Sequence, residues 1–206
     1  MTMTLHYAPG TIAAATAITL YEAGIEFDAV RVDFSKGEQL GTNYRAVNSK
    51  GRVPALVTDK GVLTETIALL EYIAAQVPDA GLVPEDAFDA ARMRSVMSYL
   101  ASTMHVNHAH RMRGSRWADL ETSWADMQGK VAETMTASAA FVEAEALDGP
   151  FVIGDQLTLA DPYLYVVSLW LEGDGVAVSD FPKLAAFQAM MHARPAVRKA
   201  VADGFL

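Results

Sequence analysis

Apolar and polar residues alternate with two different periods along the chain. In its first part, runs with a period of two, typical of strands, alternate with runs at helical spacing. The predicted strands are residues 4–7, 27–34, 53–57 and 62–63, and the predicted helices are residues 11–23 and 65–76. With a short helix before the third strand, this order predicts an α/β unit that begins with a parallel β-α-β motif and ends with an antiparallel hairpin.

The second part of the chain shows helical spacing without a convincing strand. A linker is predicted where Pro78, Gly81 and Pro84 interrupt the pattern. Beyond it, the predicted helices are residues 86–113, 121–147, 158–171, 182–192 and 195–202. We therefore expect two domains, an α/β domain over residues 1–78 and an all-α helical bundle over residues 85–206.

The composition narrows the range of functions. The 206 residues include no cysteine, which excludes a disulfide framework, a Cys-ligated metal centre and a cysteine nucleophile. A formal net charge of -9 argues against a general nucleic-acid or anionic-membrane binder. No apolar run reaches the length of about 18 residues that a membrane span needs, and the first residues lack the basic region of a secretion signal. We therefore expect a cytoplasmic protein.

Thr158 and Asp161 have the spacing of a capping box at the start of a predicted helix. Each side chain would satisfy a backbone N–H group in the turn of the other. The motif predicts where a helix begins and carries no chemistry of its own.

Three segments of the first part carry candidate binding chemistry. Pro54 begins a predicted strand, although proline has no N–H group to donate to a neighbouring strand. Either the Val53–Pro54 bond is cis and turns backbone groups outward, where an extended peptide could pair with them, or the strand is an edge strand. Glu65 and Thr66 begin a helix, which is either an anion site or an N-cap with an acid in the first turn. Thr11 places a hydroxyl at the start of the first helix, which in most proteins is an N-cap.

The second part holds histidines and a basic stretch. His105 and His108 share one face of a predicted helix, whereas His110 does not. Without an inward carboxylate they make a weak zinc site, so we expect no metal and a packing or hydrogen-bonding role. The basic stretch consists of Arg111, Arg113 and Arg116 with Trp117. It could attract a carboxylate-bearing ligand, or its cations could complement the dipole of a helix end.

These features converge on one family. The motifs are residues 7–10 (YAPG), 22–24 (EAG), 48–56 (NSKGRVPAL), 63–73 (LTETIALLEYI), 159–162 (LADP), 181–184 (FPKL) and 194–197 (RPAV). Through their order and spacing, the chain from about residue 4 to residue 202 resembles the cytosolic glutathione transferase superfamily, particularly bacterial members near the beta class. The resemblance implies a thioredoxin-like first domain that holds glutathione, an all-helical second domain that shapes an electrophile pocket, and a homodimer.

The resemblance also implies which residues hold glutathione. The Val53 backbone would pair with the cysteinyl unit beside cis Pro54, while Glu65 and Thr66 would hold the γ-glutamyl group. The resemblance thus implies that glutathione binds at the Val53–Pro54 backbone and at the helix start formed by Glu65 and Thr66, the same two segments that the residue pattern alone indicates as candidate binding sites.

Further residues follow from the same resemblance. Lys36 and Arg52 are looser candidates for the glycyl carboxylate or the backbone near it, and His105 matches a histidine that lies beside the glutathione sulfur in beta-class proteins. The electrophile pocket would be built from bundle side chains, for which we expect Tyr99, His108, Met112 and Trp117.

The chain departs from the beta class at its catalytic position. Ile12 stands where beta-class members carry a cysteine, and Ala13 and Val106 replace a serine and a lysine. Serine-type transferases place their hydroxyl directly after the same Pro-Gly, where this chain has Thr11, and Tyr7 is a second hydroxyl near that loop. We therefore expect glutathione thiolate, activated by Thr11 or Tyr7, to attack a hydrophobic electrophile. The alternative is a glutathione-binding or interaction module without transferase activity.

Overall fold

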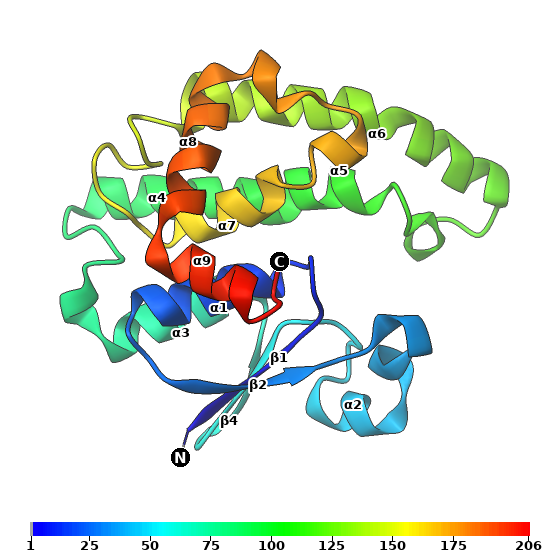
Figure 1. Ribbon diagram of the computed structural model, residues 1–206. Helices are drawn as coiled ribbons and strands as arrows, with labels where there is room; N and C mark the ends of the chain where they lie inside the picture. Colours follow the sequence, from blue (N-terminus) through cyan, green and yellow to red (C-terminus); the bar gives the residue numbers. More distant parts are fainter. Residues whose placement is uncertain (1) are drawn as a thin grey trace. The chain divides into compact units, whose positions relative to one another are not determined.

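The computed structural model describes residues 2–206, and contacts between residues divide the chain into two compact units (Figure 1). The first unit contains the chain up to Val83 together with His192–Leu206, and the second contains Pro84–Met191. The expected domains, residues 1–78 and 85–206, stay a prediction, since the contacts group the end of the chain with the first unit. Among the described helices, none is both long and apolar enough to cross a membrane.

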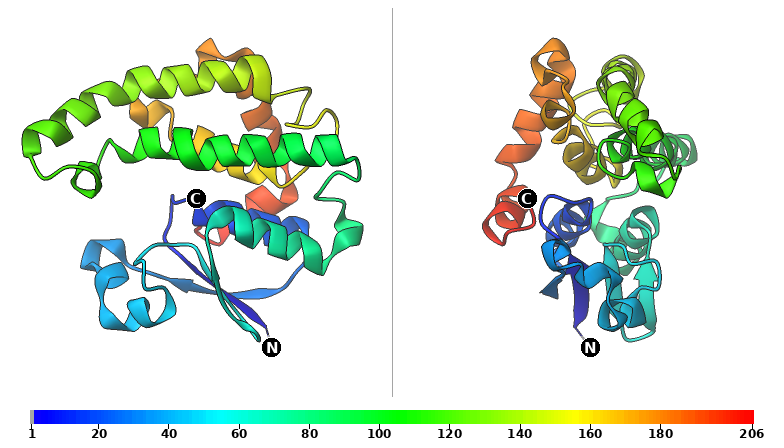
Figure 2. Two further views of the ribbon diagram at one scale, coloured as in Figure 1. Left: turned by 180° about the vertical axis from the view of Figure 1, so that it is seen from behind. Right: turned by 90° about the vertical axis from the view of Figure 1, so that its right-hand side faces the viewer.

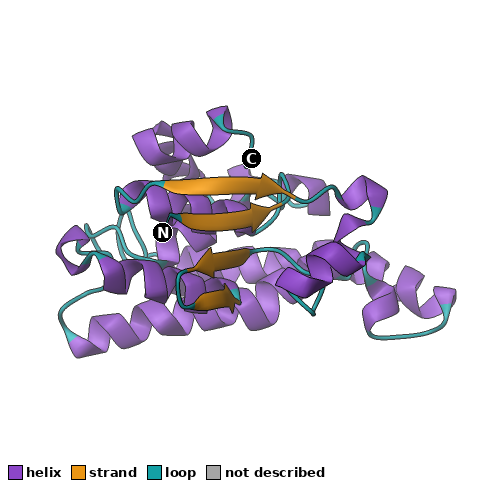
Figure 3. Cartoon of the chain, turned by 90° about the horizontal axis from the view of Figure 1, so that it is seen from below, coloured by secondary structure: helices purple, strands orange, loops and turns teal. Residues whose placement is uncertain are grey.

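A four-stranded mixed sheet in the order β2-β1-β3-β4 forms the centre of the first unit (Figure 3). The strands are β1 (Met3–Tyr7), β2 (Phe27–Arg31), β3 (Ala55–Thr58) and β4 (Gly61–Thr64). β1 pairs in parallel with β2 and antiparallel with β3, and β3 and β4 form an antiparallel hairpin. The predicted parallel start and hairpin end are thus confirmed. Leu5 lies opposite Leu56 and both are buried, so the register places the apolar period of each strand on the covered face.

The second strand ends at Arg31, earlier than the predicted residue 34, because the chain turns there. Asp33 accepts a hydrogen bond from the Ser35 N–H at 2.9 Å and caps the 3₁₀ turn Phe34–Lys36. Gly37 ends this turn in the left-handed conformation, with φ of 69°. The Val32 N–H still donates to the Tyr7 carbonyl at 2.7 Å, and the predicted alternation beyond Val32 falls on the turn and not on the strand.

Two helices cover one face of the sheet (Figures 1 and 2), namely α1 (Ala13–Glu22) and α3 (Thr66–Gln76). The opposite face is the one seen in Figure 3. α1 is buried from Ala13 to Leu20 because β1, α3 and α9 (Pro195–Ala202) all pack against it. The short helix predicted before the third strand is α2 (Thr42–Val47).

The second unit is all helical apart from one isolated β-bridge between Ile153 and Gln156. Its α-helices are α4 (Ala87–Tyr99), α5 (His105–Ala109), α6 (Glu121–Phe141), α7 (Ala160–Ser168) and α8 (Pro182–Ala193). The predicted helix 86–113 is α4 and α5 joined by a π-helical turn, and it ends at Ala109. It stops short of the prediction because the chain next passes close to α6, where a Cβ on Gly114 would meet the Trp124 side chain at 2.8 Å.

The start of α7 depends on one buried carboxylate. Asp161 accepts from the backbone N–H of Thr158 at 2.6 Å, as the capping box predicts, and from the hydroxyl of Thr158 at 2.9 Å. It also accepts from the Val152 N–H at 2.8 Å. The motif therefore fixes the preceding loop as well as the helix.

The C-terminal segment closes the first unit. The ring of the buried Phe205 lies 4.2 Å from that of Tyr7, and its carbonyl accepts from the Gly10 N–H at 2.9 Å. Arg194 forms two hydrogen bonds to the carboxylate of Glu22, at 2.6 and 2.8 Å. These contacts tie the last residues of the chain to β1, to α1 and to the loop that joins them.

Replacing Phe205 with alanine is expected to lower the free energy of unfolding by about 3–5 kcal/mol, because truncation of a buried ring leaves a cavity. The matched control is Val201→Ala, since Val201 is 42% exposed in the same segment, and its effect should stay within about 0.5 kcal/mol. Urea denaturation followed by circular dichroism measures both. Equal effects of the two substitutions would contradict the closing role of Phe205.

Candidate functional site

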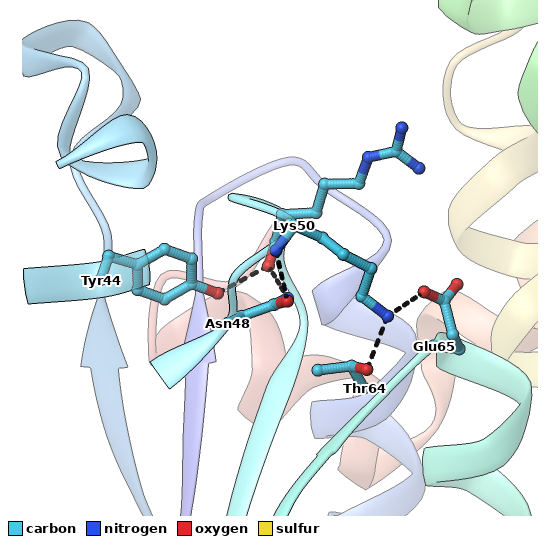
Figure 4. A network of polar contacts seen from close by, with 6 residues as sticks. Tyr44, Asn48, Lys50, Thr64 and Glu65 are labelled. Carbon is cyan, nitrogen blue, oxygen red and sulfur yellow. Dashed lines mark hydrogen bonds and ion pairs between the residues drawn. The ribbon is translucent and has the colours of Figure 1, made fainter. Parts of the chain in front are cut away.

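The approach to β3 is organised around one carbonyl oxygen. The Arg52 carbonyl accepts from the Tyr44 hydroxyl at 2.6 Å and from the Asn48 side-chain amide at 2.6 Å (Figure 4). Asn48 also accepts from the Lys50 N–H at 3.1 Å. Burial raises the pKa of Tyr44 to about 12, so its phenol keeps the proton that it donates. Together these bonds fix the turn before β3.

The peptide bond after this turn is cis. Val53 precedes Pro54 through a cis bond, which settles the two alternatives that the sequence left open. The pairing of β3 with its neighbours begins at Ala55, so Val53 lies outside the ladder. Pro54 is buried and Val53 is half-buried. The backbone of Val53 is thus available at the end of the sheet.

Glu65 has an unusual backbone at the start of α3. Among residues 2–206 it is the one non-glycine residue with positive φ, at 75°, and it serves as N-cap of the helix without a capping hydrogen bond from its side chain. Its carboxylate is 68% exposed and pairs with the Lys50 ammonium, which also donates to the Thr64 hydroxyl at 2.7 Å (Figure 4). Thr66, the first residue of α3, is buried. A strained residue of this kind typically marks a functional position.

The hydroxyl of Thr11 is already engaged. It donates to the Ala8 carbonyl at 2.7 Å and accepts weakly from the Ala13 N–H at 3.4 Å. Thr11 is half-buried and follows Gly10, whose N–H is held by the C-terminal segment. To donate to a ligand, the hydroxyl has to exchange the Ala8 carbonyl for that ligand.

The other predicted residues of the first unit have different surroundings. Tyr7 is 9% exposed at the end of β1, against Phe205. Lys36 is exposed and pairs with Asp33 at 3.2 Å. Hydrogen bonds from Ser35, with the neighbouring Lys36, hold the pKa of Asp33 down to about 2. The Arg52 side chain is exposed, and its carbonyl is the part that the structure fixes.

The predicted residues of the second unit contact different partners. Tyr99 donates to the Ser138 hydroxyl at 3.2 Å, with its ring on the α6 side of the bundle. His105 and His108 both pack on Trp170, with ring centroids 4.9 and 4.3 Å away.

Of the remaining two, Met112 is 84% exposed, while Trp117 is half exposed and meets His110 edge-on. No group of three or more His, Asp or Glu side chains within residues 2–206 is arranged to hold a metal ion.

The sequence interpretation missed several residues. Tyr44 and Lys50 act on site residues through side-chain bonds whose targets lie eight and more residues away, which no local pattern encodes. Asn48 and Lys50 do fall within one of the motifs quoted above. Asp174 belongs to none of the motifs quoted above, although a charged residue between two glycines could have indicated a built turn.

Comparisons with known proteins show which family this chain belongs to. Residues 1–75 match the profile of the glutathione S-transferase N-terminal domain, and residues 98–195 match that of the C-terminal domain. The chain therefore belongs to the glutathione S-transferase family. One curated relative is glutathione S-transferase GstA of Escherichia coli O157:H7, which is 32% identical over 97% of each chain.

Two solved structures extend the likeness. A glutathione transferase homologue from Sulfitobacter, solved with bound glutathione, is 53% identical, with a TM-score of 0.98 over 100% of this chain and 99% of that one. A beta-class transferase from Sphingomonas chungbukensis is 32% identical, with a TM-score of 0.85 over 98% of this chain and 100% of that one. The thioredoxin-like and helical domains that the sequence predicts are those of this family.

Replacing Asn48 with alanine is expected to lower the free energy of unfolding by about 1–3 kcal/mol, because the buried Asn48 side chain no longer donates to the Arg52 carbonyl. Asn43→Ala, at an exposed position of α2, is the control and should change stability by about 0.5 kcal/mol or less. Chemical denaturation of both variants measures the difference. An Asn48→Ala protein as stable as its control would show that the Tyr44 bond alone fixes the turn.

Proposed function

We propose that this transferase activates the glutathione thiolate with a hydroxyl and directs it to a hydrophobic electrophile. The observation that carries the proposal is the strained Glu65 at the start of α3, close in the chain to the cis Val53–Pro54 bond. Glutathione has an ammonium and a carboxylate on its γ-glutamyl unit and an extended cysteinyl unit. These groups match a carboxylate, a helix N-terminus and an unpaired strand end.

Each part of glutathione has a partner in this proposal. The cysteinyl backbone pairs with Val53, and the γ-glutamyl group binds Glu65 and Thr66. The ammonium of the ligand competes with Lys50 for the Glu65 carboxylate. Arg52 and Lys36 are the cations proposed for the glycyl carboxylate, and His105 is proposed to lie beside the sulfur.

The activating group is proposed to be Thr11. A thiol with a pKa of about 8.5 is only a few per cent ionised at neutral pH, and lowering that pKa by about two units takes about 2.7 kcal/mol. A charge-assisted hydrogen bond of about 1.5–3 kcal/mol and a helix dipole of about 0.3–2 kcal/mol together supply this. Tyr7 is the less suitable donor because it is nearly buried against Phe205.

The remaining parts of the proposal concern the electrophile and the setting. The pocket for the electrophile is proposed to be formed by side chains of the helical bundle, namely Tyr99, His108, Met112 and Trp117. The protein is proposed to be a cytoplasmic homodimer. Because the chain contains no cysteine, the thiol that reacts comes from glutathione.

Replacing Glu65 with glutamine is expected to raise the Kd for glutathione by about 10- to 100-fold, because a hydrogen bond between charged groups is lost. The control is Asp59→Asn, in the exposed turn between β3 and β4, which should leave the Kd within about twofold. Isothermal titration calorimetry measures both. Equal affinities would remove Glu65 from the site, and a wild-type protein that binds no glutathione at millimolar concentration would refute the proposed function.

Replacing Thr11 with valine is expected to lower kcat by about 10- to 100-fold, because the bound thiol loses the hydrogen bond that favours its anion. Affinity for glutathione should change by less than about threefold, and Thr11→Ser should retain most of the activity. Ultraviolet titration of bound glutathione checks the cause, since the thiol pKa in the valine variant should rise toward its ordinary value. Unchanged turnover would exclude Thr11 from the mechanism. A wild-type protein that binds glutathione but conjugates no electrophile would instead be the binding module of the alternative interpretation.

A further inference from the structure

The second unit contains a buried carboxylate, Asp174. The side chain of Asp174 is 0% exposed. One oxygen lies 2.7 Å from Nδ1 of His108, and the other lies 3.4 Å from a guanidinium nitrogen of Arg111. A buried carboxylate is costly unless it is paired, and each oxygen of Asp174 has a partner, His108 for one and Arg111 for the other.

The turn that carries Asp174 is shaped around these partners. The Asp174 N–H donates to the carbonyls of Trp170 and Leu171, at 3.0 and 2.9 Å, and Gly175 follows with φ of 85°. A Cβ on Gly173 would lie 2.7 Å from a guanidinium nitrogen of Arg111, so this side chain lies directly against the glycine. The loop therefore places the carboxylate against α5 and not into solvent.

The ring of His108 is fixed on two sides. Nδ1 meets Asp174, and one face stacks on the indole of Trp170 with centroids 4.3 Å apart and planes inclined by 22°. The side chain is nevertheless 28% exposed. Because Nδ1 is engaged by Asp174, Nε2 is the ring nitrogen left to exchange a proton with another partner. Nε2 lies on the edge of the ring that faces away from the carboxylate.

We propose that His108, oriented by Asp174, is a catalytic proton donor to electrophiles whose reacting oxygen becomes an anion, such as epoxides and α,β-unsaturated ketones. His108 is the catalytic residue and Asp174 is its positioning residue, because the carboxylate holds the ring and stabilises the imidazolium. This inference rests on the proposed function, since it supplies the second half of the same reaction.

The proton balance follows from the chemistry. With an epoxide, the glutathione sulfur forms a bond to ring carbon, the carbon–oxygen bond breaks, and its electron pair stays on oxygen. That oxygen takes the Nε2 proton of the imidazolium and becomes a hydroxyl. The neutral imidazole is reprotonated from water, which received the proton lost by the glutathione thiol. With an aryl chloride, chloride leaves with its electron pair and needs no proton.

The difference between these two electrophiles gives the test. Wild type, His108→Gln and Asp174→Asn are assayed with glutathione against an aryl epoxide and against 1-chloro-2,4-dinitrobenzene. For the epoxide, kcat/KM should fall by about 100-fold or more in His108→Gln and by about 10-fold or more in Asp174→Asn. For the aryl chloride, whose leaving group needs no proton, the fall in kcat/KM should be at least several-fold smaller than for the epoxide in each variant, because only the contact with the pocket is altered. The matched control, His192→Gln on the exposed surface of α8, should leave both substrates within threefold.

Three outcomes overturn the proposal. If His108→Gln lowers kcat/KM equally for both substrates, His108 and Asp174 maintain the structure of the site and do not transfer a proton. If wild type conjugates the aryl chloride but not the epoxide, the substrate class is wrong while the proposed function stands. If wild type conjugates neither, the proposed function itself fails and this inference fails with it. Should Asp174→Asn fold poorly, His108→Gln decides alone, because that side chain is partly exposed.

Discussion

The two hydrogen bonds that converge on the Arg52 carbonyl determine the geometry of the strand end that we propose binds glutathione. Tyr44 reaches this oxygen from α2 and Asn48 from the turn itself, each at 2.6 Å. They fix the backbone immediately before the cis Val53–Pro54 bond, so the strand end is presented in one orientation. Because a carbonyl has two acceptor positions, both donors can bind it fully and neither displaces the other.

The same turn also determines the electrostatics of the site. Lys50 lies between Asn48 and Arg52, and its ammonium bridges Thr64 and the strained Glu65. The carboxylate proposed for the ligand ammonium is thus neutralised by a cation from the protein. Exchange of one ammonium for another keeps the charge of the site constant, so recognition depends on geometry more than on net attraction. An acidic chain can therefore accommodate an anionic tripeptide.

Much of this arrangement could be predicted from the sequence, and the exceptions have physical causes. The period-two run of β1 predicted a strand because Leu5 and Tyr7 are buried on one face, and the cis bond was one of two interpretations of a proline that leads a strand. Long-range bonds left no local signal. The closure of Phe205 on Tyr7 joins the two ends of the chain, and the burial of Asp174 depends on a helix more than sixty residues earlier. The engagement of the Thr11 hydroxyl with Ala8 depends on one side-chain torsion, which composition and spacing do not encode.

The central claim is that a hydroxyl of this chain activates the thiol of glutathione. A crystal structure of the glutathione complex at high resolution tests it most directly. The account predicts that the cysteinyl unit pairs with the Val53 backbone and that the Thr11 hydroxyl has left the Ala8 carbonyl for the sulfur, at a hydrogen-bond distance. A sulfur that lies out of reach of Thr11, with the hydroxyl still on Ala8, would contradict the account.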